Sequence, residues 1–253
     1  MTASETVRRP GVAAYLLTQA MLPTVLLAAL AYAVLHSQTD LAVSAFFFDE
    51  AGARFPWRTQ VIVDFIGRYV IWLIPIAGGI AAGVAALASY RVAALARFRW
   101  VLWALCAVLV AMPLMVGAIK QWTASVRPWT LAMFGGSLEL PTAFWAAPGQ
   151  AGGGALPSVH TATALSLFSL YFAGWALDLP RLRWTGLAVA LAAGLLFGGL
   201  RIMQGAHFFS QTLWAAAFSW CVCSVLFAPL ICRRSRPALR AGQAAPCPST
   251  TRD

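Results

Sequence analysis

Six long apolar runs divide this sequence, and they constrain its fold more than any other feature. They cover residues of about 13–35, 69–90, 98–119, 158–177, 184–200 and 211–231. Each run is near the roughly 20 residues that a helix needs to cross a bilayer, although the fifth is short. Backbone polar groups in lipid must be satisfied within the segment, so such runs predict helices. The sequence therefore predicts an all-α, integral membrane six-helix bundle.

The composition agrees with a membrane protein. Of the 253 residues, 60% are hydrophobic and only 10% are charged, and the mean hydropathy of +0.75 lies far from the balance of a soluble domain. The first run could instead be a signal peptide, but its apolar stretch is longer than the usual h-region. The five cysteines lie in or beside the runs or in the C-terminal tail. They predict small apolar fillers and not a disulfide framework.

A single six-span domain over residues 13–231 accounts for most of the chain, because the sequence shows neither an internal repeat nor a soluble domain. Residues 1–12 form a polar N-terminal tail. Residues 232–253 are rich in Pro, Ala, Ser and Arg, a composition typical of disorder. We expect both tails to be cytoplasmic.

The positive charges indicate an orientation in the membrane. The formal net charge is +10, but the arginines are scattered at the ends of the runs and form no stripe with aromatic residues, so nucleic acid is not an expected partner. With a cytoplasmic N-terminus, the cytoplasmic face receives twelve of the 18 Lys and Arg residues and the outer face six. The positive-inside rule therefore favours this orientation, and the six outer cations need another reason.

Three polar segments fall on the outer face in this topology. They are "KQWTASVRP" at 120–128 after the third run, "PSVH" at 157–160 before the fourth, and "RIMQGAHFFSQ" at 201–211 between the fifth and sixth. Lys120, Arg127 and Arg201 are three cations with almost no acid nearby, which suits a phosphate group. Lysine supplies a compact point charge where arginine supplies a planar fork. This difference explains why the chain's only lysine stands here.

The same segments hold further groups that suit phosphate chemistry. Ser158 offers a hydroxyl, and the amides of Val159 and His160 at a helix start are anion donors. His160 and His207 are two of the three histidines in the chain. Beside a bound phosphate, one histidine can attack phosphorus while the other protonates the departing oxygen.

The order K-x6-R-P, then P-S-x-H, then R-x5-H resembles the tripartite signature of the type 2 phosphatidic acid phosphatase superfamily, the membrane lipid phosphatases related to vanadium haloperoxidases. The resemblance extends from about the third run to the sixth. It implies a phosphate site that needs neither a metal nor a cofactor. The residues implied to hold the phosphate are Lys120, Arg127, Ser158, Val159 and Arg201.

The resemblance also implies two catalytic histidines. His207 would be the nucleophile that forms a phosphohistidine, and His160 would be the acid for the leaving alcohol and then the base for water. Two positions depart from the family's pattern. Val159 stands where glycine is usual, and a β-branched residue fits there only with a negative φ. Gln211 stands where an aspartate normally follows the nucleophile by four residues.

Gln211 keeps part of the aspartate's role. Residues four apart on a helix are neighbours, so its amide oxygen can accept the Nδ1 proton of His207 but cannot offset positive charge on the ring. We therefore expect an enzyme that is active but slowed. An acid from the first outer loop could substitute for the missing aspartate, and the candidates are Asp49, Glu50 and Asp64.

The resemblance implies a metal-independent lipid phosphatase, and a compact chain rich in arginine suits the bacterial inner membrane, with the site facing the periplasm. Its partners would be the bilayer and a lipid phosphate; the oligomeric state stays open. Candidate substrates are phosphatidic acid, phosphatidylglycerol phosphate, undecaprenyl diphosphate and the phosphates of lipid A. Two alternatives remain: a lipid phosphotransferase with the same phosphohistidine, and a degenerate lipid-phosphate binding or transport protein.

Overall fold

The structure is a computed structural model that describes residues 10–141, 143–147 and 153–232. It is 72% helix and has no strand in these residues. The expected tails at 1–12 and 232–253 lie almost wholly outside the described residues. Five helices in the described part are long and apolar enough to cross a membrane, and they match the first, second, third, fifth and sixth runs. They are Val12–Leu35, α5 (Ile71–Ala88), α7 (Arg99–Ile119), α10 (Pro180–Met203) and α11 (Phe209–Ile231).

The remaining elements are shorter. Val12–Leu35 combines α1, a π-helical stretch and α2, and a second π-helical stretch leads from α4 into α5. Their bounds, with those of the other short helices, are α1 (Val12–Tyr15), α2 (Leu22–Leu35), α3 (Thr39–Phe46), α4 (Val61–Phe65), α6 (Ala93–Ala96), α8 (Val159–Leu165) and α9 (Phe168–Ala176).

The fourth apolar run is not one continuous helix, so the prediction of six unbroken spanning helices is confirmed for five runs and not for 158–177. The chain forms α8 and α9 there, with a break at Ser166 and Leu167. The Ser166 hydroxyl donates to the Thr163 carbonyl at 2.6 Å, a side-chain bond that competes with the helical hydrogen-bond pattern. The fifth run differs as well: it was expected to be short, but α10 has 24 residues.

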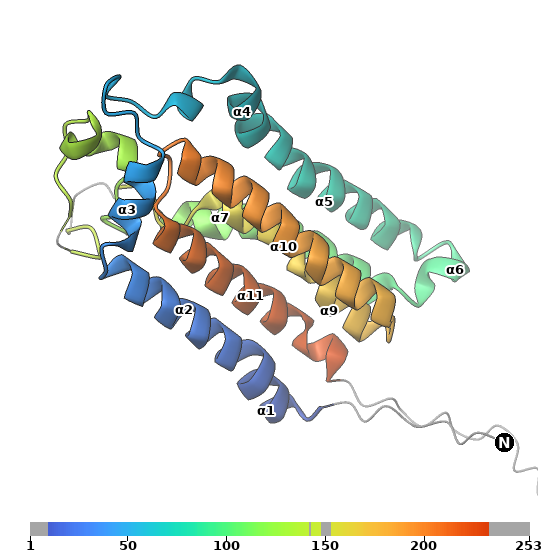
Figure 1. Ribbon diagram of the computed structural model, residues 1–253. Coiled ribbons are helices and arrows are strands. Elements are labelled where there is room, and N and C mark those ends of the chain that lie inside the picture. Colours follow the sequence, from blue (N-terminus) through green and yellow to red (C-terminus); the bar gives the residue numbers. More distant parts are fainter. Residues whose placement is uncertain (1–9, 142, 148–152, 233–253) are drawn as a thin grey trace, which may run out of the picture.

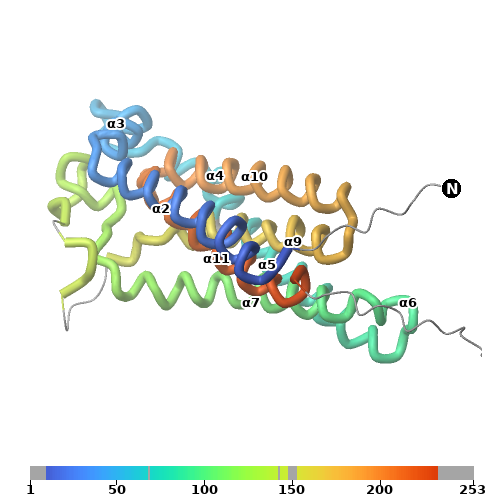
Figure 2. Tube along the Cα trace, turned by 90° about the horizontal axis from the view of Figure 1, so that it is seen from below, coloured from blue at the N-terminus to red at the C-terminus, as the bar shows by residue number. Residues whose placement is uncertain are grey.

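The bundle has two distinct ends. Figure 1 shows α3 and the loop between α7 and α8 at one end, and α1, α6 and the end of α11 at the other. Figure 2 shows the same division from below. α7 ends, and α8 and α11 begin, at the end that carries α3. The three polar segments therefore lie together at one end of the bundle, as the sequence predicts.

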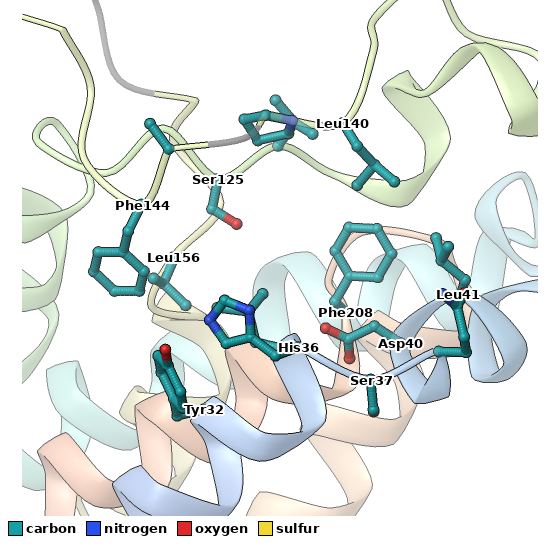
Figure 3. A pocket seen from close by; sticks show the side chains of 15 residues that line it. Tyr32, His36, Ser37, Asp40, Leu41, Ser125, Leu140, Phe144, Leu156 and Phe208 are labelled. Atoms are coloured by element: carbon teal, nitrogen blue, oxygen red, sulfur yellow. The ribbon is translucent and has the colours of Figure 1, made fainter.

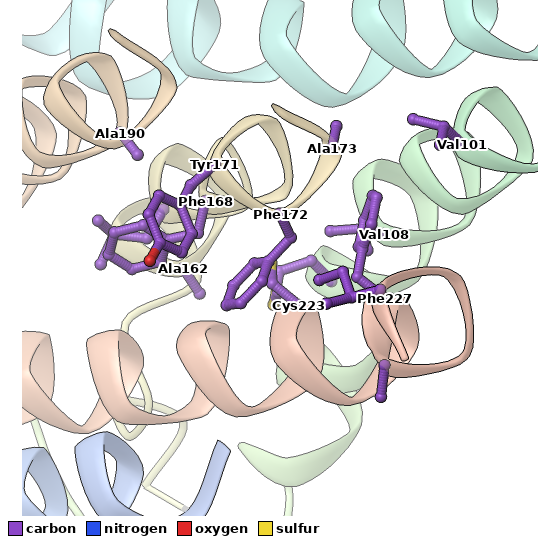
Figure 4. Packing of buried hydrophobic residues seen from close by; sticks show 14 of the residues in the cluster. Val101, Val108, Ala162, Phe168, Tyr171, Phe172, Ala173, Ala190, Cys223 and Phe227 are labelled. Atoms are coloured by element: carbon purple, nitrogen blue, oxygen red, sulfur yellow. The ribbon is translucent and has the colours of Figure 1, made fainter. Parts of the chain in front are cut away.

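The main apolar core lies between α7, α9 and α11, and the broken fourth segment is its centre. Phe168 and Phe172 of α9 pack with Phe227 and Cys223 of α11, and Val108 of α7 closes the cluster (Figure 4). Burial of such side chains is the main force that holds helices of a soluble core together, whereas in lipid close packing takes over that role. The position of α8 and α9 inside the bundle therefore places the start of α8 in the middle of the polar end.

A row of small residues lets α10 approach α8 and α9 closely. The row consists of four buried residues spaced four apart: Gly186, Ala190, Gly194 and Gly198. A Cβ atom at Gly186 would lie 2.8 Å from the backbone carbonyl carbon of Leu170, so a larger residue there would push the helices apart. Small residues at this spacing are typical of helix contacts in membranes. The close contact holds Arg201, near the end of α10, at a set distance from the start of α8.

Candidate functional site

His207 lies in the link between α10 and α11 and is only 1% exposed. Its Nδ1 atom lies 3.0 Å from the Oε1 atom of Gln211. The spacing of four residues predicts this contact, and the structure confirms it. Gln211 lies in the first turn of α11 and is also 1% exposed, so the pair is shielded from solvent.

Backbone groups determine which way the Gln211 amide points. Its Oε1 accepts the Phe208 backbone N–H at 3.1 Å, and its Nε2 donates to the Val126 carbonyl at 2.9 Å and to the Ser125 hydroxyl at 2.7 Å. An N–H cannot accept and a carbonyl cannot donate, so the oxygen and nitrogen of this amide cannot be exchanged. The Nδ1 of His207 therefore faces an acceptor and carries the ring proton. The lone pair is left on Nε2.

His160 is in the first turn of α8, and its ring faces that of His207. The two ring centroids are 6.4 Å apart, with an angle of 53° between the planes. Trp72 of α5 packs edge-on against His160, with 6.5 Å between the centroids. The separation of the histidines allows one phosphate group to contact both rings.

Lys120 caps α7 and lies near the two arginines of the motifs. Burial lowers the pKa of its ammonium group to about 8, and the positive charges of Arg127 and Arg201 contribute to this decrease. The three predicted cations are therefore close enough together to repel one another. A cluster that holds like charges in a partly buried place is stabilised when an anion binds between them.

The pKa of His207 lies well below its usual value. Burial is the largest cause, followed by the positive charges of Lys120 and Arg201, while the hydrogen bond to Gln211 acts in the opposite direction. At neutral pH the ring is therefore uncharged. A neutral imidazole with its lone pair on Nε2 is the form that can act as a nucleophile.

Neighbouring residues position both arginines. Arg127 donates from Nη2 to the Gly154 carbonyl at 3.3 Å, and its guanidinium lies 5.5 Å from the centre of the Trp129 ring. Arg58 stacks on the same ring at 4.1 Å, which adds a cation to this end that the sequence did not predict for the site. Trp129 therefore borders the cation cluster.

Arg201 is held by Gln204, the residue that follows the last residue of α10. Its Nη1 donates to the Oε1 of Gln204 at 2.8 Å, and Gln204 is only 1% exposed. The role of Gln204 was not predicted, although a spacing of three residues on a helix is a signal for such a contact. Gln204 restricts the arginine side chain before any ligand binds.

Ser158 is the N-cap of α8 and is fully buried. Its Oγ accepts the Thr161 backbone N–H at 3.4 Å and the Thr161 hydroxyl at 3.0 Å. A hydroxyl that accepts both bonds keeps its own proton for a further acceptor. Val159 begins α8 and is not among the residues with positive φ, so the backbone meets the condition expected for a β-branched residue.

Asp40 of α3 is a buried acid beside the site, and the sequence analysis did not identify it. Its carboxylate accepts the Ser210 backbone N–H at 2.8 Å and the Ser210 hydroxyl at 2.5 Å. Burial raises the pKa of Asp40, although the hydrogen bonds from Ser210 oppose that change. The two residues are 170 positions apart, so no local pattern could predict the contact. Asp40 therefore holds the start of α11 at Ser210, which follows His207 by three residues.

The acids of the first outer loop were expected as possible substitutes for the missing aspartate, but another residue occupies that position. Gln211 itself takes the contact with Nδ1 of His207, the atom at which a substitute carboxylate would act. Asp49 pairs through its backbone with Arg54 in an isolated bridge. A catalytic role for Asp49, Glu50 or Asp64 stays a prediction.

Among residues 10–141, 143–147 and 153–232, no group of three or more His, Cys, Asp or Glu side chains is placed to hold a metal ion. The polar donors of the charged cluster are instead N–H groups of lysine and arginine, which bind anions.

A pocket of about 640 Å³ lies next to the charged cluster (Figure 3). The last turn of α2, the first turn of α3 and parts of the loop between α7 and α8 form its walls. Ser125 lines this pocket and also accepts the hydrogen bond from Gln211. Neither histidine of the site and none of the three motif cations lines it. The pocket therefore borders the residues that position His207, and not the two histidines or the three cations.

The comparison with protein families agrees with the motifs. The sequence model of the PAP2 superfamily matches residues 101–230, which is 130 of the 253 residues and includes all three polar segments. No curated protein and no solved structure matches the chain. Since the match covers more than half of the sequence and holds the whole charged cluster, this chain belongs to the PAP2 superfamily.

Proposed function

We propose that this protein is a membrane lipid phosphatase that works through a phosphohistidine at His207 and needs no metal. Membership of the PAP2 superfamily supports phosphatase activity on phosphate esters, and the five long apolar helices support a multi-pass membrane protein. The observation that carries the proposal is the orientation of His207. Gln211 holds the proton on Nδ1, which leaves a neutral Nε2 beside three cations.

The first chemical step transfers the phosphoryl group to the enzyme. Nε2 of His207 attacks phosphorus, and the bond between phosphorus and the lipid oxygen breaks. Protonated His160 donates its proton to that oxygen, so the lipid alcohol leaves neutral, or the lipid monophosphate leaves with one negative charge fewer. Lys120, Arg127 and Arg201 stabilise the charge on the phosphoryl oxygens.

The second step restores the enzyme. Water attacks the phosphorus of the phosphohistidine, and His160, now neutral, accepts a proton from the water. The bond between phosphorus and Nε2 breaks, and His207 leaves as a neutral imidazole. Inorganic phosphate is released, and both histidines return to their starting protonation states.

Gln211 affects both steps through charge. When Nε2 bonds to phosphorus, the ring of His207 becomes positive, and its Nδ1 proton stays hydrogen-bonded to a neutral oxygen. Orientation is kept, but the opposite charge that a carboxylate would provide is absent. We therefore propose that the protein turns over more slowly than a form with an aspartate at this position.

The site is proposed to face the periplasm of a bacterial inner membrane, with both termini in the cytoplasm. The unequal distribution of arginines supports this orientation. In a cysteine-free background, an impermeant thiol reagent added to intact cells should label cysteine at Ser137, which is exposed at the polar end, and not cysteine at Ala244. Labelling of position 244 alone would reverse the topology.

Phosphate release by the purified protein tests the function. The panel contains phosphatidic acid, phosphatidylglycerol phosphate, undecaprenyl diphosphate and a lipid A phosphate, each assayed with and without EDTA. Free phosphate in the presence of EDTA is the expected result. Transfer of labelled phosphate to a second lipid would make the protein a phosphotransferase, and binding without turnover would make it a lipid-phosphate binding protein. Loss of release in EDTA would contradict the metal-free mechanism.

A further inference from the structure

An apolar groove of about 620 Å³ runs along the outside of the bundle between α2 and α10. Figure 1 shows α11 between these two helices, and α11 forms the floor of the groove. The walls are rich in leucine, with Leu26 and Leu27 on α2 and Leu187, Leu191 and Leu195 on α10. A cavity of this size is within the range of roughly 300–1,000 Å³ that is usual for ligand pockets.

The two threonines of the groove do not make it polar. The Thr161 hydroxyl bonds to Ser158 at 3.0 Å, and the Thr212 hydroxyl donates to the Phe209 carbonyl at 2.7 Å. A Cβ atom at Gly198 would lie 3.3 Å from the Thr161 hydroxyl oxygen, and 3.5 Å and 3.7 Å from the Cγ2 atoms of Thr161 and Thr212. Both hydroxyls are therefore used inside the protein, and the groove presents carbon to its occupant.

One end of the groove meets the proposed phosphate site. Thr161 follows His160 directly, and Ile202 follows Arg201 directly; both line the groove. From Leu187 to Ile202 the wall follows α10 over 15 residue-to-residue steps, or about 22 Å at a rise of roughly 1.5 Å per residue. The hydrocarbon core of a bilayer is about 30 Å thick. The groove therefore extends from the level of the cations past the middle of the membrane.

We infer that this groove holds a hydrocarbon chain of the lipid whose phosphate lies at His207. The inference rests on the proposed function, since it assigns the apolar part of the same substrate. Three cations at one end of an apolar groove complement a molecule with a phosphate head and a long chain. The groove is open because α10 carries glycines on this side. At Gly199, which lines it, an added Cβ atom would meet no protein atom within 4 Å.

Gly199→Leu tests the inference, because the added side chain enters the groove without contacting the protein at its Cβ. We expect kcat/KM for a long-chain lipid phosphate to fall about tenfold or more, the range by which apolar pockets respond to lost or blocked volume. Turnover of the water-soluble ester p-nitrophenyl phosphate should stay at the parent value, because this substrate has no chain to place.

Ala192→Leu is the matched control. Ala192 is exposed on α10 and is not one of the groove residues, so the same apolar addition leaves the groove open and both activities unchanged. Equal losses on both substrates, equal losses in both variants, or an unchanged kcat/KM for the long-chain lipid in Gly199→Leu would each overturn the inference. A change of oligomeric state in Gly199→Leu alone would assign the groove to a second copy of the chain instead.

A second measurement does not depend on turnover. A lipid phosphate with a photoreactive group at the end of its chain is irradiated with the His207→Ala variant, and crosslinked peptides are identified by mass spectrometry. Crosslinks in α2, α10 and α11 that disappear with Gly199→Leu support the groove. Crosslinks elsewhere overturn it. If the parent releases phosphate from no substrate, the proposed function fails, and the crosslinks still decide what the groove binds.

Discussion

Two polar contacts at the start of α11 use different acceptors. The Ser210 backbone N–H and hydroxyl meet a carboxylate, that of Asp40. Three residues earlier, Nδ1 of His207 meets a neutral amide, that of Gln211. The first contact places negative charge at a helix N-terminus, where it is stabilising. The second places no charge beside the ring that would become positive during reaction.

The contrast separates two tasks that one aspartate usually combines. Orientation needs only an acceptor in the right place, and Gln211 supplies it through an amide whose direction is set by Phe208 and Val126. Charge compensation needs a carboxylate. The nearby buried carboxylate, that of Asp40, is hydrogen-bonded to Ser210 instead. The contact at Ser210 therefore includes a carboxylate, whereas the contact at His207 provides orientation without a charge.

The largest effect is expected from His207→Ala. This change removes the nucleophile itself, so turnover of lipid phosphate should fall by about 10⁴-fold or more, as it does when the nucleophile of a covalent mechanism is lost. Phosphate release is the measurement. His36→Ala is the control, because His36 is exposed at the end of α2 and its loss should leave turnover unchanged. Normal turnover in His207→Ala would remove this region from the mechanism.

His160→Ala should slow turnover by about 10²- to 10⁴-fold, because it removes the proton donor but keeps the nucleophile. The loss should be much smaller for p-nitrophenyl phosphate, whose leaving group needs little protonation. Comparison of the two substrates in parent and variant gives the test. An equal loss on both would assign His160 to phosphate binding and not to acid catalysis.

Gln211→Asp brings the missing charge to the reacting contact and should raise kcat at least about tenfold, equivalent to about 1.4 kcal/mol of barrier. Gln211→Glu is the sharper partner. It keeps the length of the side chain, but its second oxygen replaces the Nε2 that donates to the Val126 carbonyl at 2.9 Å, so two acceptors face each other. We expect a smaller gain from glutamate than from aspartate. Slower turnover in Gln211→Asp would refute the charge argument.

The dependence of kcat/KM on pH tests whether the positive charge of Lys120 contributes to phosphate binding. The pKa of Lys120 is lowered to about 8, so in the free enzyme its positive charge is present below pH 8 and is lost as the pH rises above it. kcat/KM for a phosphate monoester should therefore fall above pH 8, by about tenfold for each further pH unit. Lys120→Arg should remove this decrease, although its planar fork lowers activity overall. A flat profile in the parent would contradict the assignment.

The smallest effect on activity is expected at the other contact. Asp40→Ala removes both acceptor oxygens and leaves the buried Ser210 N–H and hydroxyl without them, and this should cost about 1–3 kcal/mol of stability. Thermal unfolding in detergent is the measurement, with kcat determined in parallel below the melting range. A large loss of kcat without a loss of stability would place Asp40 in the chemistry and remove the contrast between the two contacts.

Contacts between neighbours in the sequence were predictable. The pairing of Gln211 with His207 follows from helical spacing. The meeting of the three polar segments follows from the alternation of apolar runs across a membrane, which places every second loop on one face. The structure confirms both features.

Other features could not be predicted from local patterns. Asp40 reaches Ser210 across 170 positions, and only tertiary packing brings them together. The break between α8 and α9 was missed because hydropathy does not distinguish one apolar helix from two. The bonds that decide it, such as that of Ser166 to Thr163, depend on side-chain rotamers. Ser125 contacts Gln211 from a loop, where no period applies.

A phosphoenzyme trap tests the central claim most directly. Parent and His160→Ala proteins are mixed with a ³²P-labelled lipid phosphate, quenched in alkali, digested, and mapped by mass spectrometry, since phosphohistidine survives under these conditions better than phosphoserine. The account predicts label on His207, with more of it in the variant, where breakdown by water lacks its base. Label on another residue, or turnover without any label on His207 in either protein, would contradict it.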